Sequence, residues 1–197
     1  MNLYWGSGDI KNDIDNNKTD TIKNVSNRIY FYSEINTENV LNLVQILRQN
    51  DDTFIVKSKE LNLENLIPIY LHIQSYGGEI FSGFSAMDNI LMCKSPVITI
   101  VDGVCASAGT FLSIVGKKRL ITKNSYMLIH QLSSFHWGKY SELEDQKQNM
   151  DNFMIKIKDI YSQYTKIPKL ILDDILKHDL FLDATKCLEY GLVDEII

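Results

Sequence analysis

A run of five uncharged residues at positions 97–101, Val-Ile-Thr-Ile-Val, constrains the fold of this chain more than any other feature. The run does not alternate between charged and apolar positions, which is typical of a strand buried on both faces of a parallel sheet. Helical patterns flank it on both sides. Because parallel strands need crossover connections, the sequence predicts an α/β domain built from repeated βαβ units.

The same reasoning places the other elements. Short runs of β-branched and aromatic residues predict strands at residues 28–32, 69–73 and 126–130. Residues 50–68 are rich in charged residues and Asn, which predicts an irregular connection or insertion. Apolar residues at helical spacing predict helices that begin after the cap Thr37 and at residues 79–92, 107–115, 141–165, 170–177 and 184–190, the last capped by Asp183 and ended by Gly191.

Composition limits the classes of protein to consider. The 197 residues, 45% hydrophobic and 23% charged, suit one globular domain. A formal net charge of -5 argues against nucleic-acid binding, and no apolar run approaches the roughly 18 residues of a membrane span. The first residues lack the apolar core of a signal peptide, so we expect a cytoplasmic or organelle-interior location, such as the plastid stroma.

The N-terminus and the cysteines allow two smaller predictions. Residues 1–27 are rich in Asn, Asp, Lys and Thr and are expected to form a solvated, mobile arm before a domain at 28–197. The three cysteines lack the spacing of a metal site or a disulfide framework. We expect Cys93, Cys105 and Cys187 to be small buried side chains in a reducing compartment, with no metal bound.

Residues 103–109, Gly-Val-Cys-Ala-Ser-Ala-Gly, follow the apolar strand and contain a candidate nucleophile. Small neighbours of Ser107 let a substrate backbone approach, and a serine that opens a helix lies near unpaired N–H groups that stabilise an oxyanion. The segment is not a G-x-S-x-G elbow, because Cys105 and Gly109 stand two positions away. These residues alone leave two roles open for Ser107, nucleophile or cap of a packed helix.

Candidate partners for Ser107 lie in two other segments. A Gly-Gly pair at 77–78 can turn a backbone N–H outward, so Gly78 and Ala108 are the candidate oxyanion donors, although such a pair also makes an ordinary turn. His130 ends an apolar strand at the edge of the sheet where ligands bind, as a base or as a structural residue. Its competitors are His72, His136 and His178.

Taken in order, these segments resemble the proteolytic subunit family of the Clp protease. The shared motifs are S-x-G-G at 75–78, G-x-x-A-S-x-G-x-F-L at 103–112, M-x-I-H-Q at 127–131, H-D-x-F-L at 178–182 and E-Y-G-L-V-D at 189–194. The resemblance covers residues 28–197. It implies a catalytic triad of Ser107, His130 and Asp179, and only the resemblance singles out Asp179.

The resemblance also implies a crotonase-like α/β fold with a handle helix at residues 140–165. Ser133, Ser134 and Phe135 would belong to a strand that binds substrate. The implied protein is a serine endopeptidase subunit that cleaves unfolded polypeptides inside two stacked seven-membered rings, without a metal or cofactor. ATP would be used by a partner AAA+ unfoldase, since this chain has no P-loop.

Several positions depart from the family pattern. Tyr76 and Leu132 stand where the family usually has Pro, and the turn at Tyr76 is expected to be less rigid as a result. The surface that receives an ATPase loop is usually apolar, and each polar replacement is expected to weaken docking by about 1 kcal/mol. Tyr70 and Ile100 fit that surface, whereas His72, Asp102 and Thr122 do not.

Two other functions stay open at this point. One is a non-catalytic structural subunit of a mixed ring, although relatives of that kind usually lack a triad residue and this chain fills all three positions. The other is an acyl-CoA enzyme, because a crotonase-like fold can use a similar oxyanion hole on a thioester. No acidic residue is clearly placed beside Gly78 for the proton abstraction that such an enzyme needs, so the peptidase is favoured.

Overall fold

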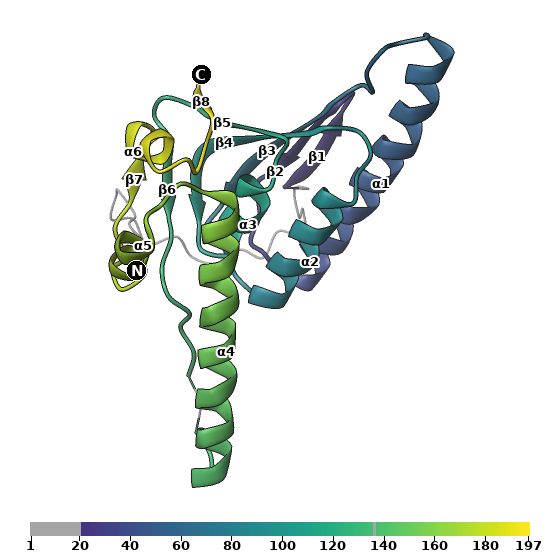
Figure 1. Cartoon of the computed structure of the whole chain (residues 1–197). Coiled ribbons are helices and arrows are strands. Elements are labelled where there is room, and N and C mark those ends of the chain that lie inside the picture. The colour runs from purple at the N-terminus through teal and green to yellow at the C-terminus, as the bar shows by residue number, and fades with distance from the viewer. Residues whose placement is uncertain (1–20, 136) are drawn as a thin grey trace, which may run out of the picture.

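The computed structural model describes residues 21–135 and 137–197 (Figure 1). Their strands are β1 (Ile22–Val25), β2 (Arg28–Phe31), β3 (Ile69–Ser75), β4 (Val97–Ala106), β5 (Lys118–Ile121), β6 (Tyr126–Leu128), β7 (Leu182–Asp183) and β8 (Glu195–Ile196). They form one sheet in the order β1-β2-β3-β4-β5-β8, and β6 pairs with both β4 and β7. Only β1–β2 and β6–β7 are antiparallel among the described pairs, so the sheet is mainly parallel, as the sequence predicts.

The helices lie unequally around this sheet. They are α1 (Thr37–Glu60), α2 (Ile80–Leu91), α3 (Gly109–Ile114), α4 (Tyr140–Tyr164), α5 (Lys169–Ile175) and α6 (Ala184–Glu189). In β3, Ile69, Leu71 and Ile73 are fully buried in the core shared with α1, α2 and α3, whereas Tyr70 and His72 are half-buried on the opposite face. Figure 1 shows α4 projecting away from the rest of the molecule.

Strand β4 changes neighbours along its length. Its first half pairs with β5 through residues 98–101, and its second half pairs with β6 through residues 104–106. Gly103 lies between the two halves with φ +94°, a conformation that glycine adopts readily, and its N–H donates to Ser125 Oγ at 2.6 Å. The carboxyl ends of β4 and β6 therefore lie side by side, which brings the segments that follow them together.

Helix α1 corrects the prediction that residues 50–68 are irregular. The helix continues to Glu60, and its cap is Asn36 rather than Thr37, because the Asn36 side chain accepts the N–H of Asn39 at 2.9 Å. Asn50 and Asp51, two of the polar residues that led to this prediction, are buried and hydrogen-bonded. Asn24 and Asn50 exchange two 3.0 Å side-chain hydrogen bonds, and the two Asp51 oxygens accept backbone N–H groups of the α2–β4 connection.

Other boundaries differ in smaller ways. The sequence predicts that residues 22–25 belong to the N-terminal arm, but they form β1 at the edge of the sheet, and residues 1–20 lie outside the described part. The strands β5, β7 and β8 were not predicted, and β6 ends two residues before His130. The Asp183 cap of α6 is confirmed, since its side chain accepts the Lys186 N–H at 2.8 Å. In the described part of the chain, no helix has the length and apolarity to cross a membrane.

Replacement of Asp51 by Ala is expected to destabilise the fold. Its two carboxylate oxygens accept the N–H groups of Lys94 at 3.0 Å and Ser95 at 2.7 Å, and the side chain is buried. Loss of the acceptor leaves both donors unpaired, at a cost of about 2–4 kcal/mol in the free energy of unfolding. Chemical denaturation measures this, with the exposed neighbour Asp52→Ala as control. Equal stability of the two variants would contradict the account.

Candidate active site

Ser107 occupies a strained turn between β4 and α3. Its φ is +53°, in the left-handed region where a residue other than glycine costs about 1–3 kcal/mol. Its N–H donates to Leu128 O at 2.9 Å, and its carbonyl accepts the N–H and the hydroxyl of Thr110 at 3.0 and 2.6 Å. Helix α3 begins only at Gly109, so Ser107 does not open the helix as predicted. The turn presents the serine side chain ahead of the helix.

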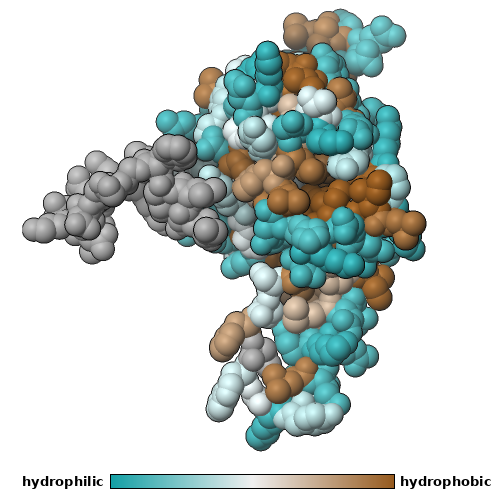
Figure 2. Space-filling view, turned by 90° about the vertical axis from the view of Figure 1, so that its left-hand side faces the viewer, coloured by the Kyte–Doolittle hydropathy of each residue, from teal (hydrophilic) through white to brown (hydrophobic). Residues whose placement is uncertain are grey.

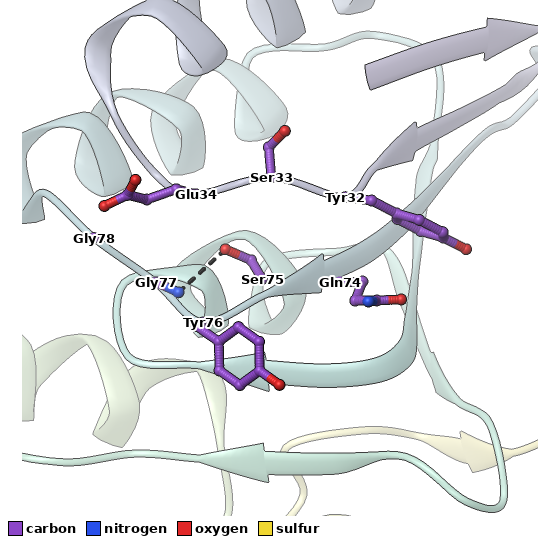
Figure 3. A pocket seen from close by; sticks show the side chains of 8 residues that line it. All are labelled: Tyr32, Ser33, Glu34, Gln74, Ser75, Tyr76, Gly77 and Gly78. Atoms are coloured by element: carbon purple, nitrogen blue, oxygen red, sulfur yellow. Dashed lines mark hydrogen bonds between the residues drawn. The ribbon is translucent and has the colours of Figure 1, made fainter. Parts of the chain in front are cut away.

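The Gly-Gly turn after β3 lies directly against Ser107. A Cβ atom on Gly77 would be 2.6 Å from Ser107 Cβ, and Gly77 has φ +96°. The turn is tied down on its other side, because Gly77 O accepts the N–H of Ile35 and Ile35 O accepts the N–H of Glu79, both at 2.8 Å. Figure 3 shows the turn and the 3.1 Å hydrogen bond from Gly77 N–H to Ser75 Oγ. Only glycine at position 77 permits this approach.

The two predicted oxyanion donors are available for a ligand. The N–H groups of Gly78 and Ala108 take no part in the loop and turn hydrogen bonds of the described residues. Both residues line the same small cavity as Ser107. Two free backbone donors beside a serine hydroxyl match what a tetrahedral intermediate requires.

His130 and Asp179 come together from distant parts of the chain. His130 follows β6, Asp179 lies between α5 and β7, and His130 Nδ1 is 3.0 Å from Asp179 Oδ1. The backbone beside His130 is fixed because Gln131 N–H donates to Leu176 O at 2.7 Å. The Asp179 side chain is 79% exposed, so the pair contributes little to stability, and its main effect is to orient the imidazole.

One cavity of about 40 Å³ collects most of the predicted site. Ser107 and His130 both line it, together with the two donor residues. The remaining walls are apolar or aromatic. The lining residues are Gly78, Ile80, Ser107, Ala108, Phe111, His130, Leu132, Ile157 and Tyr161. The structure therefore brings the serine, the histidine and the donors to one place, with Asp179 bound to the far side of the imidazole.

The predicted substrate strand forms no sheet pairing in the single chain. Ser133, Ser134 and Phe135 have no regular secondary structure, and the side-chain amide of Gln146 in α4 reaches Ser134 Oγ at 3.4 Å. Phe135 is 93% exposed. The projecting lower part of the molecule carries apolar side chains among polar ones (Figure 2). A role of this segment in binding peptide stays a prediction.

A larger cavity lies along the same Gly-Gly turn. It is open to solvent, measures about 510 Å³ and includes neither Ser107 nor His130 in its lining (Figure 3). Sequence reasoning gave no signal for it, because its walls come from the β2–α1 connection and the end of β3. The lining residues are Tyr32, Ser33, Glu34, Gln74, Ser75, Tyr76, Gly77 and Gly78.

His72 and Asp102, which stand where the family usually has apolar residues, belong to a connected cluster of polar side chains. The cluster lies on the face of the sheet opposite α1, α2 and α3, here called the open face. Tyr32 donates its hydroxyl to Asp102 at 2.6 Å, His72 Nδ1 lies 3.4 Å from the same carboxylate, and Arg28 lies 3.1 Å from His72 Nε2. Burial lowers the pKa of His72, an effect that Asp102 opposes and Arg28 reinforces. Sequence reasoning found His72 and Asp102 but missed Arg28 in β2 and Tyr32 just after it, because these contacts join residues of different strands.

Other reactive groups do not compete with this site. Burial raises the pKa of the Cys105 and Cys187 thiols to about 12, so neither is a thiolate at neutral pH. Across residues 21–135 and 137–197, no group of three His, Cys, Asp or Glu residues is arranged to hold a metal ion. His178 lies 3.9 Å from Asp174, away from the cavity, and His136 lies outside the described residues.

Comparisons with known proteins agree with the motifs. The model of the family described as Clp protease matches residues 20–197. ATP-dependent Clp protease proteolytic subunits from Deinococcus radiodurans and Protochlamydia amoebophila are 33% and 36% identical to this chain, each over 66% of it. A chloroplastic subunit 3 from Arabidopsis thaliana is 31% identical over 94% of this chain. The matched regions span 64%, 65% and 63% of the lengths of these three relatives.

A solved structure supports the same fold. A ClpP1 mutant from Listeria monocytogenes superimposes with a TM-score of 0.71, covers 85% of this chain and 88% of that chain, and is 24% identical in sequence. The likeness confirms the crotonase-like α/β fold that the motifs imply.

Replacement of Gly77 by Ala is expected to abolish the reactivity of Ser107. The new Cβ would lie 2.6 Å from Ser107 Cβ and 2.8 Å from Ala106 O, so one of the two turns must move. Labelling of Ser107 by a fluorophosphonate should fall by about 100-fold or more, because displacements of about 1 Å at a reacting centre have effects of this size. The measurement is the labelling rate, read by mass spectrometry of the intact chain.

Gly103→Ala is the matched control for this experiment. Gly103 has nearly the same φ, +94°, but a Cβ there meets only the end of the Gln74 side chain at 3.3 Å. This variant should lose stability and keep Ser107 labelling. If both variants label at the rate of the parent chain, the close approach of the two turns does not control Ser107.

Proposed function

Because this chain belongs to the Clp protease family, we propose that it is an active serine endopeptidase subunit that cleaves unfolded polypeptides to short peptides. Ser107 is the nucleophile, His130 the general base and acid, and Asp179 the residue that orients His130. Gly78 and Ala108 supply the backbone donors of the oxyanion hole. No metal or cofactor takes part in this chemistry.

The reaction has two halves. His130 Nε2 takes the proton of Ser107 Oγ as the oxygen attacks the peptide carbonyl, and the N–H groups of Gly78 and Ala108 hold the negative oxygen that forms. The C–N bond then breaks, and His130 gives the proton to the leaving amine. Water, deprotonated by His130, attacks the acyl-enzyme; the ester C–O bond breaks, the second peptide leaves, and His130 returns the proton to Ser107 Oγ.

One observation carries the proposal. His130 Nδ1 is bound by Asp179 at 3.0 Å while His130 and Ser107 line the same cavity. With Nδ1 held as a donor to the carboxylate, the imidazole has the tautomer in which Nε2 can accept a proton. This arrangement supports a catalytic subunit over one that only supports a ring.

We extend the proposal to the assembly. The subunits form a double heptameric ring, and a Clp-type AAA+ unfoldase consumes ATP and feeds it polypeptides. The extended α4 handle, which projects from the single chain in Figure 1, supports contacts between rings. The open sheet face offers Tyr70 to an unfoldase loop, but Ile100 is buried at 3% exposure, and Tyr32, His72 and Asp102 are polar and interconnected. A loop that binds only through apolar side chains would dock weakly here.

Substitution of the triad residues tests the catalytic proposal. Ser107→Ala is expected to reduce hydrolysis of a small fluorogenic peptide to background, while ring assembly measured by mass photometry is unchanged. Asp179→Ala is expected to reduce kcat on the order of 10²- to 10⁴-fold, because His130 loses the partner that fixes its tautomer. Asp174→Ala, a nearby exposed acid that lies 3.9 Å from His178, is the control and should keep full activity.

A different result would identify a structural subunit. An assembled ring in which Ser107 reacts with no fluorophosphonate, and which cleaves no peptide until a second subunit is added, would contradict the catalytic role. Equal loss of activity in the Asp179 and Asp174 variants would contradict the assignment of Asp179 alone.

The sheet-face cluster leads to a prediction about pH. Burial lowers the folded-state pKa of His72 below its ordinary 6.5, so unfolded chains bind more protons near that pH and the fold loses stability as the pH falls below about 6.5. Asp102→Asn removes the charge that favours protonated His72 and should lower this pKa further. NMR titration of the imidazole measures it, with Glu195→Gln, a carboxylate on β8, as control. A His72 pKa of 6.5 or more in the parent chain, or one unmoved by Asp102→Asn, would contradict this account.

A further inference from the structure

The N–H of Gly78 belongs to a peptide unit whose direction is fixed from outside the active site. This N–H and the carbonyl of Gly77 are parts of the same peptide unit, and in a trans peptide the two groups point in opposite directions. The peptide bond between them is trans, and Gly77 O accepts the Ile35 N–H at 2.8 Å. The Gly78 N–H therefore points away from Ile35. Gly78 lines the cavity beside Ser107 and Ile35 does not, so this N–H is available to a ligand in the cavity.

Ile35, in the connection between β2 and α1, contacts the chain on both sides of Gly78. Besides the hydrogen bond to Gly77, its carbonyl accepts the Glu79 N–H at 2.8 Å, so this one residue binds both peptide units of Gly78. Ile35 is fully buried. Figure 3 shows the same connection, at Ser33 and Glu34, running beside the Gly-Gly turn. The direction of the Gly78 N–H thus depends on where the connection lies.

The side chain of Glu79 joins this connection to the helix that follows Gly78. Its Oε2 accepts the hydroxyl of Ser82, in the first turn of α2, at 2.6 Å, and the hydroxyl of Thr37, the first residue of α1, at 3.2 Å. The hydrogen bonds from Ser82 and Thr37 lower the pKa of the Glu79 carboxyl from its ordinary value, so the acceptor is a carboxylate at neutral pH. Glu79 does not line the cavity beside Ser107. Its carboxylate is bound to the two helices instead.

We propose that Glu79 is a positioning residue for the oxyanion hole. Its carboxylate ties Thr37 to Ser82, which keeps Ile35 against the Gly-Gly turn and so orients the Gly78 N–H toward the oxyanion. The inference rests on the proposed peptidase function and adds a residue that acts only through Gly78. Because the oxyanion exists only after Ser107 attacks, the orientation of this N–H affects the transition state and not the binding of the substrate.

Steady-state kinetics of the assembled Glu79→Ala variant test this role. The kcat on a fluorogenic peptide is expected to fall about 10- to 100-fold with KM unchanged, less than the roughly 100- to 1000-fold loss that follows removal of an oxyanion donor. Glu79→Gln keeps an acceptor oxygen at the same reach and should recover most of the lost rate. Asp88→Ala removes an exposed carboxylate from the same helix, so it is the control and should keep the kcat of the parent chain.

Inhibition by a peptide boronic acid separates positioning from a loss of stability. Ser107 Oγ bonds to the boron, His130 takes the serine proton, no group leaves, and one boron hydroxyl lies in the oxyanion hole. The inhibition constant does not depend on the fraction of protein that is folded. In Glu79→Ala it is expected to rise by the factor by which kcat/KM falls, because the boronate adduct resembles the transition state. A variant that is only less stable would keep the inhibition constant of the parent chain.

The two hydroxyl donors show whether the effect passes through Glu79. Ser82→Ala and Thr37→Val each remove one hydrogen bond to its carboxylate, and each should raise the inhibition constant by a smaller factor than Glu79→Ala. Ser82→Ala added to Glu79→Ala should cause no further rise, because the group through which Ser82 acts is already gone. These milder variants also decide the question if Glu79→Ala does not fold.

The outcomes separate the positioning role from the function on which it rests. If the parent chain cleaves the peptide while Glu79→Ala keeps both its kcat and its inhibition constant, the role of Glu79 is wrong and the peptidase proposal stands. A rise in KM with kcat unchanged, or a further rise in the inhibition constant when Ser82→Ala is added, also overturns the role. If the assembled parent chain cleaves no peptide and Ser107 reacts with no fluorophosphonate, the peptidase proposal fails and the positioning role fails with it.

Discussion

Two turns meet at Gly77 and Ser107 so closely that no side chain fits between them, and the geometry of the site depends on this contact. The turns follow β3 and β4, which are parallel neighbours and therefore end at the same edge of the sheet. Ser75 uses its hydroxyl to accept the Gly77 N–H, and Ile35 binds the turn from the other side. The carbonyl groups and the serine hydroxyl around the turn are used in these bonds, and none of them accepts the N–H of Gly78 or Ala108. These two N–H groups therefore remain for a ligand.

The site was predictable from sequence to different degrees. Small residues directly after apolar strands indicate both Ser107 and the Gly-Gly turn, because close backbone contacts exclude larger side chains. Asp179 has no local signal, because its role depends only on a 3.0 Å contact with His130, a residue from another part of the chain. The cavity wall formed by Tyr161 was also missed, because a tyrosine at helical spacing reads as ordinary core. Family motifs recover Asp179, since they record order along the chain, but they do not report the size of a cavity.

The fold shows a similar division. The apolar strand at 97–101 and the long helices follow from hydrophobic periodicity, which is strong over many residues. The second half of α1 was misread because Asn50 and Asp51 look solvated, while the structure buries them with partners more than 20 residues away. Strands β7 and β8 have two residues each, too few for a pattern, and are defined by their neighbours in the sheet. Long-range pairing of polar groups is the information that a local pattern lacks.

Hydrogen bonds from β6 and α3 hold the left-handed backbone of Ser107, and α4 contacts both this network and the cavity beside Ser107. Leu128, at the end of β6, accepts the Ser107 N–H, and Thr110 in α3 donates to the Ser107 carbonyl. Tyr161 in α4 donates in turn to Thr110, while its ring closes the cavity. Each net hydrogen bond contributes about 1 kcal/mol, so together they offset a left-handed serine that costs about 1–3 kcal/mol. The buried end of α4 therefore has two roles: it supports the hydrogen bonds around Ser107, and it forms a wall of the cavity. The projecting end of α4 has neither role.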